Sequence, residues 1–133
     1  MEATRTSRYV HGQFCWVDLV AYDMSAASNF YGDLFDWTVE MQDTDGGPPY
    51  AMFHRDGAVV AGIGEMSDDM RETGRPPTWN SYVHVDDIHD AIDQADTLGA
   101  TIVVPPMEVM NAGWLAYLQD PTGATVGLWQ DGV

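Results

Sequence analysis

The sequence contains no lysine, and basic residues of any kind are rare in it. Its five bases are all arginines and are opposed by 21 acids, so the formal net charge is −16. A surface with this balance repels nucleic-acid phosphates and anionic lipid headgroups, which argues against nucleic acid and membranes as partners. The acidity has two interpretations: an adaptation to high salt, or a general compositional bias that favours solubility.

Cysteine and long apolar runs are also scarce. The single cysteine, Cys15, excludes an intrachain disulfide, and its apolar neighbours indicate a small core residue rather than a nucleophile. No run of 18 apolar residues is present, and the first residues lack the apolar segment of a secretory signal. The patterns GxSxG, GxxxxGK and GxGxxG are missing as well. We therefore expect a cytoplasmic protein that uses none of these catalytic or phosphate-binding motifs.

The most informative stretch that is present runs over residues 14–37, FCWVDLVAYDMSAASNFYGDLFDW. Alternation predicts a strand in which every second residue from Cys15 to Leu19 forms an apolar face that packs against a helix. That helix is capped by Asp23 or Ser25 and ends at Asp36, a residue type that tolerates the left-handed conformation. The apolar residues at helical spacing, which we expect to face the core, are Ala27, Phe30, Tyr31, Leu34 and Phe35.

A weaker copy of this pattern follows a polar segment. A strand from Trp79 to Val85 precedes a helix capped by Asp86 or Asp87. A further strand is expected from Ala100 to Val104, ended by Pro105 and Pro106. A shift of 63 positions superposes Asp23 on Asp86, and both halves close with a hairpin. The repeated order predicts a tandem βαβββ arrangement within one α+β domain spanning residues 1–133. The expected boundaries are module one at about 10–66, a linker at about 67–77 and module two at about 78–130.

Several motifs in this order resemble the vicinal oxygen chelate superfamily, which holds glyoxalase I, bleomycin-resistance proteins and extradiol dioxygenases. They are DMSAASNFYGDLFDW, VAGIG, DPTGA and the terminal GLW. Together with the WVDL start they look more specifically like an actinobacterial-type, glyoxalase-like subgroup. The resemblance implies two βαβββ modules whose sheets curl into a cup, and paired chains. Open sheets also need their edges covered, so we expect a homodimer.

In metal-dependent members of this superfamily, the ligands come from the first and last strand of each module. Carried over to this sequence, those positions are Trp16, Ala61, Asn80 and Gly127. A divalent ion needs three or four converging nitrogen, oxygen or sulfur donors, and only Asn80 offers even a weak one. We therefore expect a protein without a metal or other cofactor, which argues against glyoxalase and dioxygenase activity.

Strand alternation predicts which side chains line the cup. Trp16 and Asp18 share one face of the first strand, and small residues at 61 and 127 are expected to leave room for a ligand. Val59, Ala61 and Ile63 are expected on the closing strand of module one, and Thr125, Gly127 and Trp129 on that of module two. The candidate ligand-binding residues are Trp16, Asp18, Asn80, Tyr82, His84, Thr125 and Trp129.

These residues suggest three functions. The leading hypothesis is a metal-free protein that binds a small aromatic or hydrophobic molecule, as in drug sequestration, because tryptophan and tyrosine suit flat ligands. The second is a lyase or isomerase in which Asp18 and His84 act as acid and base, with desolvation raising the pKa of Asp18. The third is a metal-dependent enzyme of the glyoxalase or dioxygenase kind.

Overall fold

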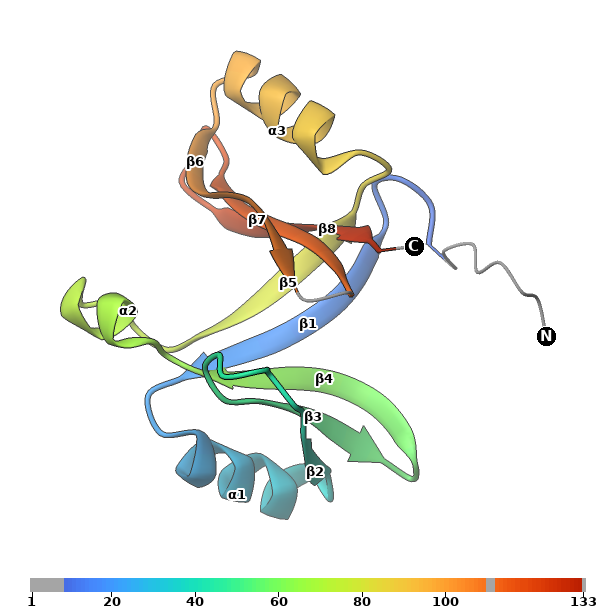
Figure 1. The fold of residues 1–133 in the computed structure, drawn as a ribbon, viewed down its shortest axis with the longest axis vertical. Helices are drawn as coiled ribbons and strands as arrows, with labels where there is room; N and C mark the ends of the chain where they lie inside the picture. Colours follow the sequence, from blue (N-terminus) through green and yellow to red (C-terminus); the bar gives the residue numbers. More distant parts are fainter. Residues whose placement is uncertain (1–8, 110–111, 133) are drawn as a thin grey trace. The chain divides into compact units, whose positions relative to one another are not determined.

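The computed structural model describes residues 9–109 and 112–132. These residues form two compact units: a first unit, Val17–Asn80, and a second unit made of the described residues of Met1–Trp16 and Ser81–Val133. The element order is βαβββ, a short helix, then βαβββ again, so the predicted α+β fold with two βαβββ modules is confirmed (Figure 1). No helix within the described residues has both the length and the apolar character needed to cross a bilayer.

The first module begins with a strand and a helix. Its elements are β1 (Phe14–Ala21), α1 (Met24–Phe35), β2 (Thr38–Met41), β3 (Tyr50–Arg55) and β4 (Ala58–Glu65). The strand order is β2-β3-β4-β1, with β1 parallel to β4 and the other neighbours antiparallel. The boundary between the two units passes through β1, so Phe14–Trp16 are grouped with the second unit.

Local signals set the limits of α1 and of the β3–β4 turn. The Asp23 carboxylate accepts a hydrogen bond from the amide of Ala26 at 3.0 Å, which confirms Asp23 as the cap. The helix ends at Asp36, whose φ of 63° is left-handed as predicted. Asp56 and Gly57 both have positive φ, 52° and 80°, as a tight two-residue hairpin turn requires.

The core of the first unit lies between α1 and one face of its strands. Ala27 and Tyr31 of α1 pack against this cluster, whose buried members are Leu19, Ala21, Met24, Ala51, Phe53, Ala61 and Ile63. Two sequence predictions are therefore wrong. Ala61 and Ile63 face α1, not the opposite side of the sheet. The residues Phe30, Leu34 and Phe35 are exposed rather than buried, because the apolar stripe of α1 is wider than its contact with the sheet.

The second module repeats the arrangement. Its elements are β5 (Thr78–His84), α3 (Ile88–Thr97), β6 (Thr101–Val109), β7 (Gly113–Gln119) and β8 (Thr125–Asp131). The strand order is β5-β8-β7-β6, with β5 parallel to β8. Residues 78–80 of β5 are grouped with the first unit. The buried core beneath α3 consists of Val85, Ile88, Ile92, Ala116, Leu118 and Leu128.

The start of α3 corrects the alignment of the two halves. The carboxylate of Asp87 accepts hydrogen bonds from the amides of His89 and Asp90, both at 3.1 Å, so Asp87 rather than Asp86 is the cap. Asp23 therefore superposes on Asp87, a shift of 64 positions (87 − 23) rather than 63. With this shift, Asp18 corresponds to Tyr82. Gly99, the residue after the C-cap Leu98, has a positive φ of 99°, a conformation that glycine adopts readily at a helix end.

Two segments differ from the sequence prediction. The segment expected to be a linker contains the short helix α2 (Asp68–Glu72), capped by the Ser67 hydroxyl, which accepts from the Met70 amide. Strand β6 does not end at Pro105 but continues through Pro106 to Val109. This is possible because β6 is the outermost strand of its four and its pairing with β7 is interrupted between Val104 and Met107, so neither proline has to donate to the ladder.

Candidate functional site

Asp18 lies on the face of β1 opposite α1. Its neighbour Leu19 points into the core beneath α1, and alternation sends Asp18 to the other side. The Asp18 carboxylate is only 7% exposed, and it accepts hydrogen bonds from the Tyr50 hydroxyl at 3.3 Å and the Asn80 amide at 3.4 Å. The structure therefore brings together two of the predicted ligand-binding residues, Asp18 and Asn80.

The β4 residue beside Asp18 is Gly62, which pairs with it in the parallel β1–β4 ladder. This pairing moves the position that faces away from α1 from Ala61, as predicted, to Gly62. Further along β4, a Cβ atom at Gly64 would lie 3.1 Å from Cδ1 of Tyr50, so the tyrosine ring packs directly over the glycine backbone. Tyr50 was missed by sequence reasoning, although its alternation with core residues Ala51 and Phe53 places it on this face.

In the second unit, Tyr82 and Tyr117 occupy the face opposite α3. Their hydroxyl groups form a hydrogen bond, and their ring centroids are 5.6 Å apart. Gly127 pairs with both tyrosines in the ladders of β8. A Cβ atom at Gly127 would lie 2.5 Å from Cδ2 of Tyr82. The room that the sequence predicted at Gly127 is thus filled by the Tyr82 ring, and Tyr117, absent from the prediction, is part of this face.

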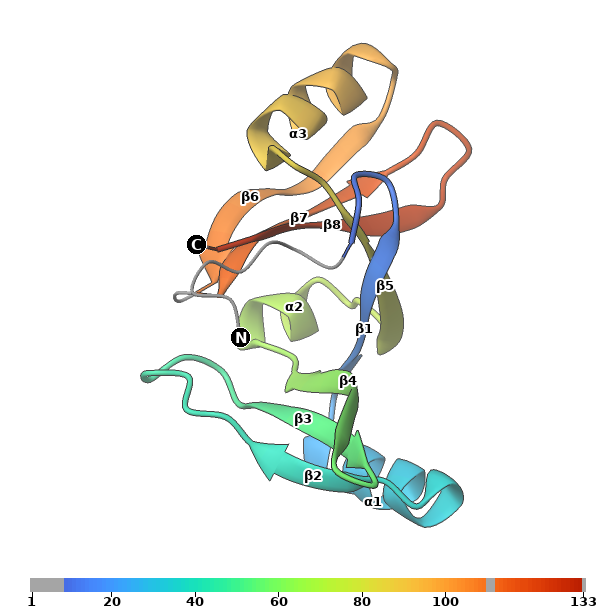
Figure 2. The same cartoon turned by 90° about the vertical axis from the view of Figure 1, so that its right-hand side faces the viewer.

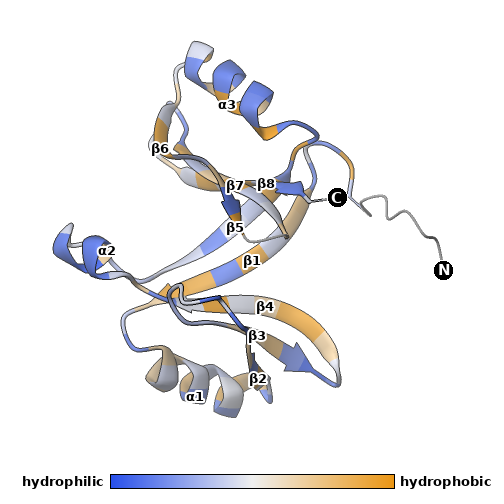
Figure 3. Ribbon diagram, in the orientation of Figure 1, coloured by the Kyte–Doolittle hydropathy of each residue, from blue (hydrophilic) through white to orange (hydrophobic). Residues whose placement is uncertain are grey.

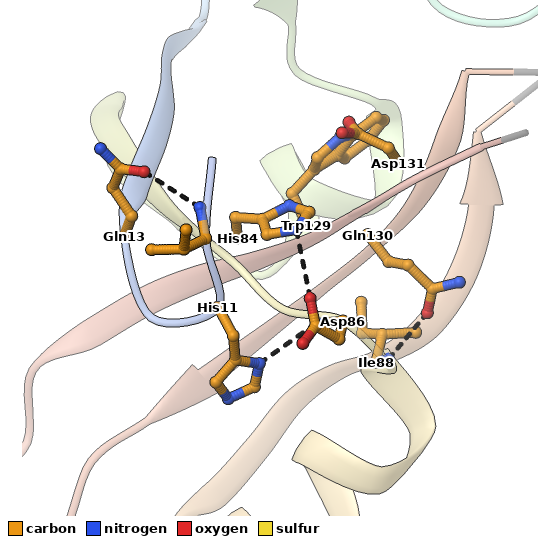
Figure 4. Close-up of polar contacts among 9 residues, drawn as sticks. His11, Gln13, His84, Asp86, Ile88, Trp129, Gln130 and Asp131 are labelled. Carbon is orange, nitrogen blue, oxygen red and sulfur yellow. Dashed lines mark hydrogen bonds and ion pairs between the residues drawn. The ribbon is translucent and has the colours of Figure 1, made fainter. Parts of the chain in front are cut away.

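His84 lies two residues further along β5, on the same face as Tyr82. Its backbone is held by Gln13 and Gly12, which accept from and donate to it at 2.8 Å. His84 is only 5% exposed, and its Nε2 lies 3.7 Å from a carboxylate oxygen of Asp86 (Figure 4). Its Nδ1 forms no hydrogen bond with any described residue. A buried polar atom without a partner is uncommon and calls for an explanation.

The remaining candidates lie at or near this face of the second unit. Trp129 pairs with His84 in the β5–β8 ladder, and its indole N–H donates to the Asp131 carboxylate at 2.7 Å (Figure 4). Thr125 is exposed at the start of β8, and Trp16 is half-buried in β1. The structure therefore groups Tyr82, His84 and Trp129. Asp18 belongs to the other unit, so the proposed Asp18–His84 pair stays a prediction.

Cys15 behaves as a protected thiol. Burial, assisted by the nearby charge of Asp131, raises its pKa from 9.0 to about 11. At pH 8 the thiolate fraction should be roughly 100-fold lower than for an unperturbed cysteine, so a disulfide reagent should react correspondingly slowly. The rate should still be rising above pH 10 in a stopped-flow pH series. A plateau by pH 9 would contradict this assignment.

The side chains of the described residues do not fit a divalent metal ion. In residues 9–109 and 112–132, no three His, Cys, Asp or Glu side chains converge so that they could hold one. With the corrected β4 register, the positions at which the superfamily places ligands carry Trp16, Gly62, Asn80 and Gly127. The two glycines have no side-chain donor and the Trp indole only donates hydrogen bonds. The Asn80 amide is directed at Asp18.

Comparison with known families gives a match over most of the chain. The model of the Glyoxalase/Bleomycin resistance protein/Dioxygenase superfamily matches residues 13–128. Among curated proteins, "Putative glyoxylase CFP32" of Mycobacterium tuberculosis is 39% identical over 127 residues, covering 95% of this chain and 48% of the relative. "Anthracycline biosynthesis protein DnrV" of Streptomyces peucetius is 30% identical, covering 96% and 50%. The chain thus spans about half the length of these relatives.

Solved structures share the fold at low sequence identity. Methylmalonyl-CoA epimerase from Mycobacterium tuberculosis superposes with a TM-score of 0.63 at 15% identity, covering 97% of this chain and 94% of the epimerase. A hypothetical protein, BH1468 from Bacillus halodurans, gives a TM-score of 0.66 at 13% identity, covering 92% and 96%. At these identities the likeness concerns the fold alone.

Proposed function

Because the chain belongs to the glyoxalase/bleomycin resistance protein/dioxygenase superfamily, we propose that it binds a small aromatic or hydrophobic organic molecule without a metal ion. One observation carries this proposal. Within the described residues, the buried polar or charged side chains are Asp18 and His84, and both lie on sheet faces opposite the helices α1 and α3. The polar groups are therefore kept out of the two hydrophobic cores and on the faces that a ligand can use.

The physical argument concerns the cost of burial. Taking a carboxylate or an imidazole out of water is unfavourable unless a partner compensates it. Tyr50 and Asn80 donate hydrogen bonds to the Asp18 carboxylate, whereas Nδ1 of His84 has no partner among the described residues. Groups held in this way, next to aromatic rings, are typical of sites that orient a ligand through a few polar contacts. The proposed contacts are Asp18 and Asn80 in the first unit, and Trp16, Tyr82, His84, Thr125 and Trp129 in the second.

The aromatic residues suggest the class of ligand. Tyr82 and Tyr117 lie beside Trp129 on the face opposite α3, and such rings bind flat, partly apolar molecules. One relative is named an anthracycline biosynthesis protein. Anthracyclines, as a chemical class, are flat polycyclic aromatic molecules that carry hydroxyl and carbonyl groups. Binding without turnover would serve drug sequestration, a role that the resistance proteins in the family name suggest.

A second candidate function is proton transfer to or from the bound molecule. The observation in its favour is the Asp18 carboxylate, which is buried and held in place by the Tyr50 hydroxyl and the Asn80 amide. A positioned carboxylate can act as a general base, with His84 as the candidate acid. This would make the protein a lyase or isomerase. The test is whether the molecule recovered after binding is unchanged.

The experiment titrates an anthracycline into the protein and follows ligand fluorescence. Trp129→Ala should weaken binding about tenfold or more, because a stacking surface is lost from the face opposite α3. Trp114→Ala is the matched control. Trp114 lies on the adjacent strand β7 but packs with the core beneath α3, so ligand affinity should change less than about twofold in folded protein.

Three outcomes decide between the candidates. Equal loss of affinity in both tryptophan variants, or none in either, would contradict the proposed binding face. Recovery of unchanged ligand supports binding, whereas turnover abolished by Asp18→Asn supports the enzyme. Stoichiometric zinc, nickel, iron or manganese in protein purified without chelator would overturn the metal-free part of the proposal.

A further inference from the structure

His84 carries a ring nitrogen that no other described group satisfies. The residue lies at the end of β5 in the second unit, and alternation with the core residue Val83 places it on the face opposite α3. It is 5% exposed, and its Nδ1 is enclosed by protein without a hydrogen bond in residues 9–109 and 112–132. Buried polar atoms are nearly always paired, so this exception calls for a functional explanation.

The backbone around His84 is fixed from both sides. Its amide donates to the carbonyl of Gln13 and its carbonyl accepts from the amide of Gly12, both at 2.8 Å. The amide of Val85 donates to the carbonyl of Trp129 at 2.9 Å. Figures 1 and 2 both draw the segment before β1 beside the end of β5. The imidazole therefore projects from a backbone position that two neighbouring segments hold in place.

Asp86 lies beside the other ring nitrogen of His84. One of its carboxylate oxygens is 3.7 Å from Nε2. The backbone of Asp86 is held as well, because its amide donates to Nδ1 of His11 at 3.1 Å. Two residues further on, the amide of Ile88 donates to the side-chain oxygen of Gln130 at 2.8 Å. The carboxylate therefore stands at a defined place just beyond β5, where its charge acts on His84.

The charge of Asp86 selects the nitrogen of neutral His84 that carries the proton. A carboxylate favours an N–H group directed at it and disfavours a lone pair there. At 3.7 Å this attraction is electrostatic rather than a hydrogen bond, and it is weakened by water because 77% of the Asp86 side chain is exposed. The two tautomers of an imidazole are close in free energy, so a weak preference is enough. The proton is therefore expected on Nε2, which leaves a lone pair on Nδ1.

We propose that Nδ1 of His84 accepts a hydrogen bond from a hydroxyl group of the bound aromatic molecule, and that Asp86 is the positioning residue that keeps the proton on Nε2. The proposed contact rests on the binding function above and limits the ligand to a chemical class, the phenols and other hydroxylated aromatics. A lone pair shielded from water gains from an O–H donor, because a low local dielectric strengthens the bond. An ether oxygen in the same place would leave two acceptors without a donor.

The aromatic neighbour of His84 suits a ligand of this class. Trp129 pairs with His84 in the β5–β8 ladder, where neighbouring strands are about 5 Å apart. A flat ring that stacks on the indole thus has its edge, and a hydroxyl group on that edge, next to the imidazole. Because Nδ1 is enclosed, the hydroxyl reaches it only when a neighbouring side chain moves, and Trp129 is half-buried on this face.

Nitrogen-15 NMR of the histidine side chains tests the tautomer in the protein alone. Above the usual range of histidine titration, Nδ1 of His84 should have the chemical shift of an unprotonated nitrogen and Nε2 that of a protonated one. Asp86→Ala should move both shifts toward the values of a mixed population. This variant keeps the backbone amide that donates to His11, so the segment should stay folded. A wild-type His84 that is protonated on Nδ1 would overturn the proposal.

The matched control for the tautomer is Asp90→Ala. Asp90 is another acid close in sequence, in the first turn of α3, a largely hydrophilic helix (Figure 3). The carboxylate beside Nε2 of His84 belongs to Asp86, so Asp90→Ala should leave the His84 shifts unchanged. Equal changes in the two variants would mean that the net charge, rather than the position of Asp86, sets the tautomer.

Calorimetric titration with 2-naphthol and its methyl ether tests the ligand class. The two molecules share one flat ring system and differ in the O–H group, so 2-naphthol should bind about tenfold more tightly. Asp86→Ala should weaken 2-naphthol about threefold or more and leave the ether unchanged, whereas Asp90→Ala should affect neither. Equal affinities of the wild type for both molecules would overturn the proposed hydrogen bond but leave the binding function standing. If neither molecule binds, the binding function fails and the hydrogen bond with it.

Discussion

Replacing Phe53 by alanine should lower the free energy of unfolding by about 3–5 kcal/mol, the largest single-residue effect expected in this chain. Phe53 is fully buried on β3, and its ring contacts those of Tyr31 and Trp37 at centroid distances of 6.3 Å and 5.0 Å. Truncation removes these contacts and leaves a cavity that the surrounding strands cannot fill. A single domain is stable by only about 5–15 kcal/mol, so much of the margin would be lost.

Phe35→Ala is the control for Phe53→Ala. Phe35 belongs to the same cluster of aromatic side chains, and its ring centroid lies 4.9 Å from that of Trp37. It is nevertheless half-exposed at the end of α1. Its removal should cost clearly less, on the order of 1 kcal/mol, because little of the side chain leaves a packed site. Urea unfolding of both variants measures the difference. Equal losses would mean that Phe53 is not the centre of the first core.

Replacing Gly127 by alanine should lower the free energy of unfolding by about 1–3 kcal/mol, although alanine suits a strand better than glycine. The new Cβ would lie 2.5 Å from Cδ2 and 2.8 Å from Cε2 of Tyr82. The ring of Tyr82 cannot move freely, because its hydroxyl group forms a hydrogen bond with that of Tyr117 and because Tyr82 is buried. The clash therefore has to displace the ring or separate β8 from β5.

Two measurements check the Gly127 prediction. Thr125→Ala, on the exposed start of the same strand, should change stability by less than about 0.5 kcal/mol. Combining Gly127→Ala with Tyr82→Leu should cost less than the sum of the two single changes, because the smaller side chain relieves the clash. Strict additivity, or a stable Gly127→Ala protein, would mean that the space beside Gly127 is open.

The order of helices and strands was predictable from the sequence because residues that cap helices and form turns mark where each element begins and ends. Asp23 and Asp36 limit α1, Gly99 follows α3, and the Asp56–Gly57 pair turns the β3–β4 hairpin, all through contacts within a few residues. Such signals act through the local backbone and do not depend on the rest of the fold. The repeat was therefore visible even though the two halves share few identical residues.

Features that depend on neighbours in space were harder to predict. The exposure of Phe30 and Leu34 depends on how much of α1 the sheet covers, which helical spacing does not encode. Strand β6 continues through Pro105 and Pro106 because it is outermost in its module and its pairing with β7 is interrupted there, and neither strand order nor ladder register is a local property. Two adjacent aspartates, Asp86 and Asp87, could each cap α3, and the sequence alone did not show which of them does.

The candidate site shows the same division. Alternation within one strand correctly put Asp18 opposite Leu19, and Tyr82 and His84 opposite Val83. It could not reveal Tyr50 or Tyr117, which approach from other strands, and it misplaced Ala61 by one position. The pairing register relates strands that are distant in sequence. An error of one residue in that register assigns each side chain of the strand to the wrong face of the sheet.

The two prolines in β6 have a further consequence for association between copies of the chain. If the outermost strands of both modules could pair with a strand of another copy, each copy added to an assembly would leave one unpaired edge strand. Filaments could then grow without limit. Pro105 and Pro106 lack amide hydrogens, and the register of β6 shifts on either side of Val104. The edge formed by β6 in the described residues is therefore a poor template for a strand of another chain, so open-ended growth through it is disfavoured.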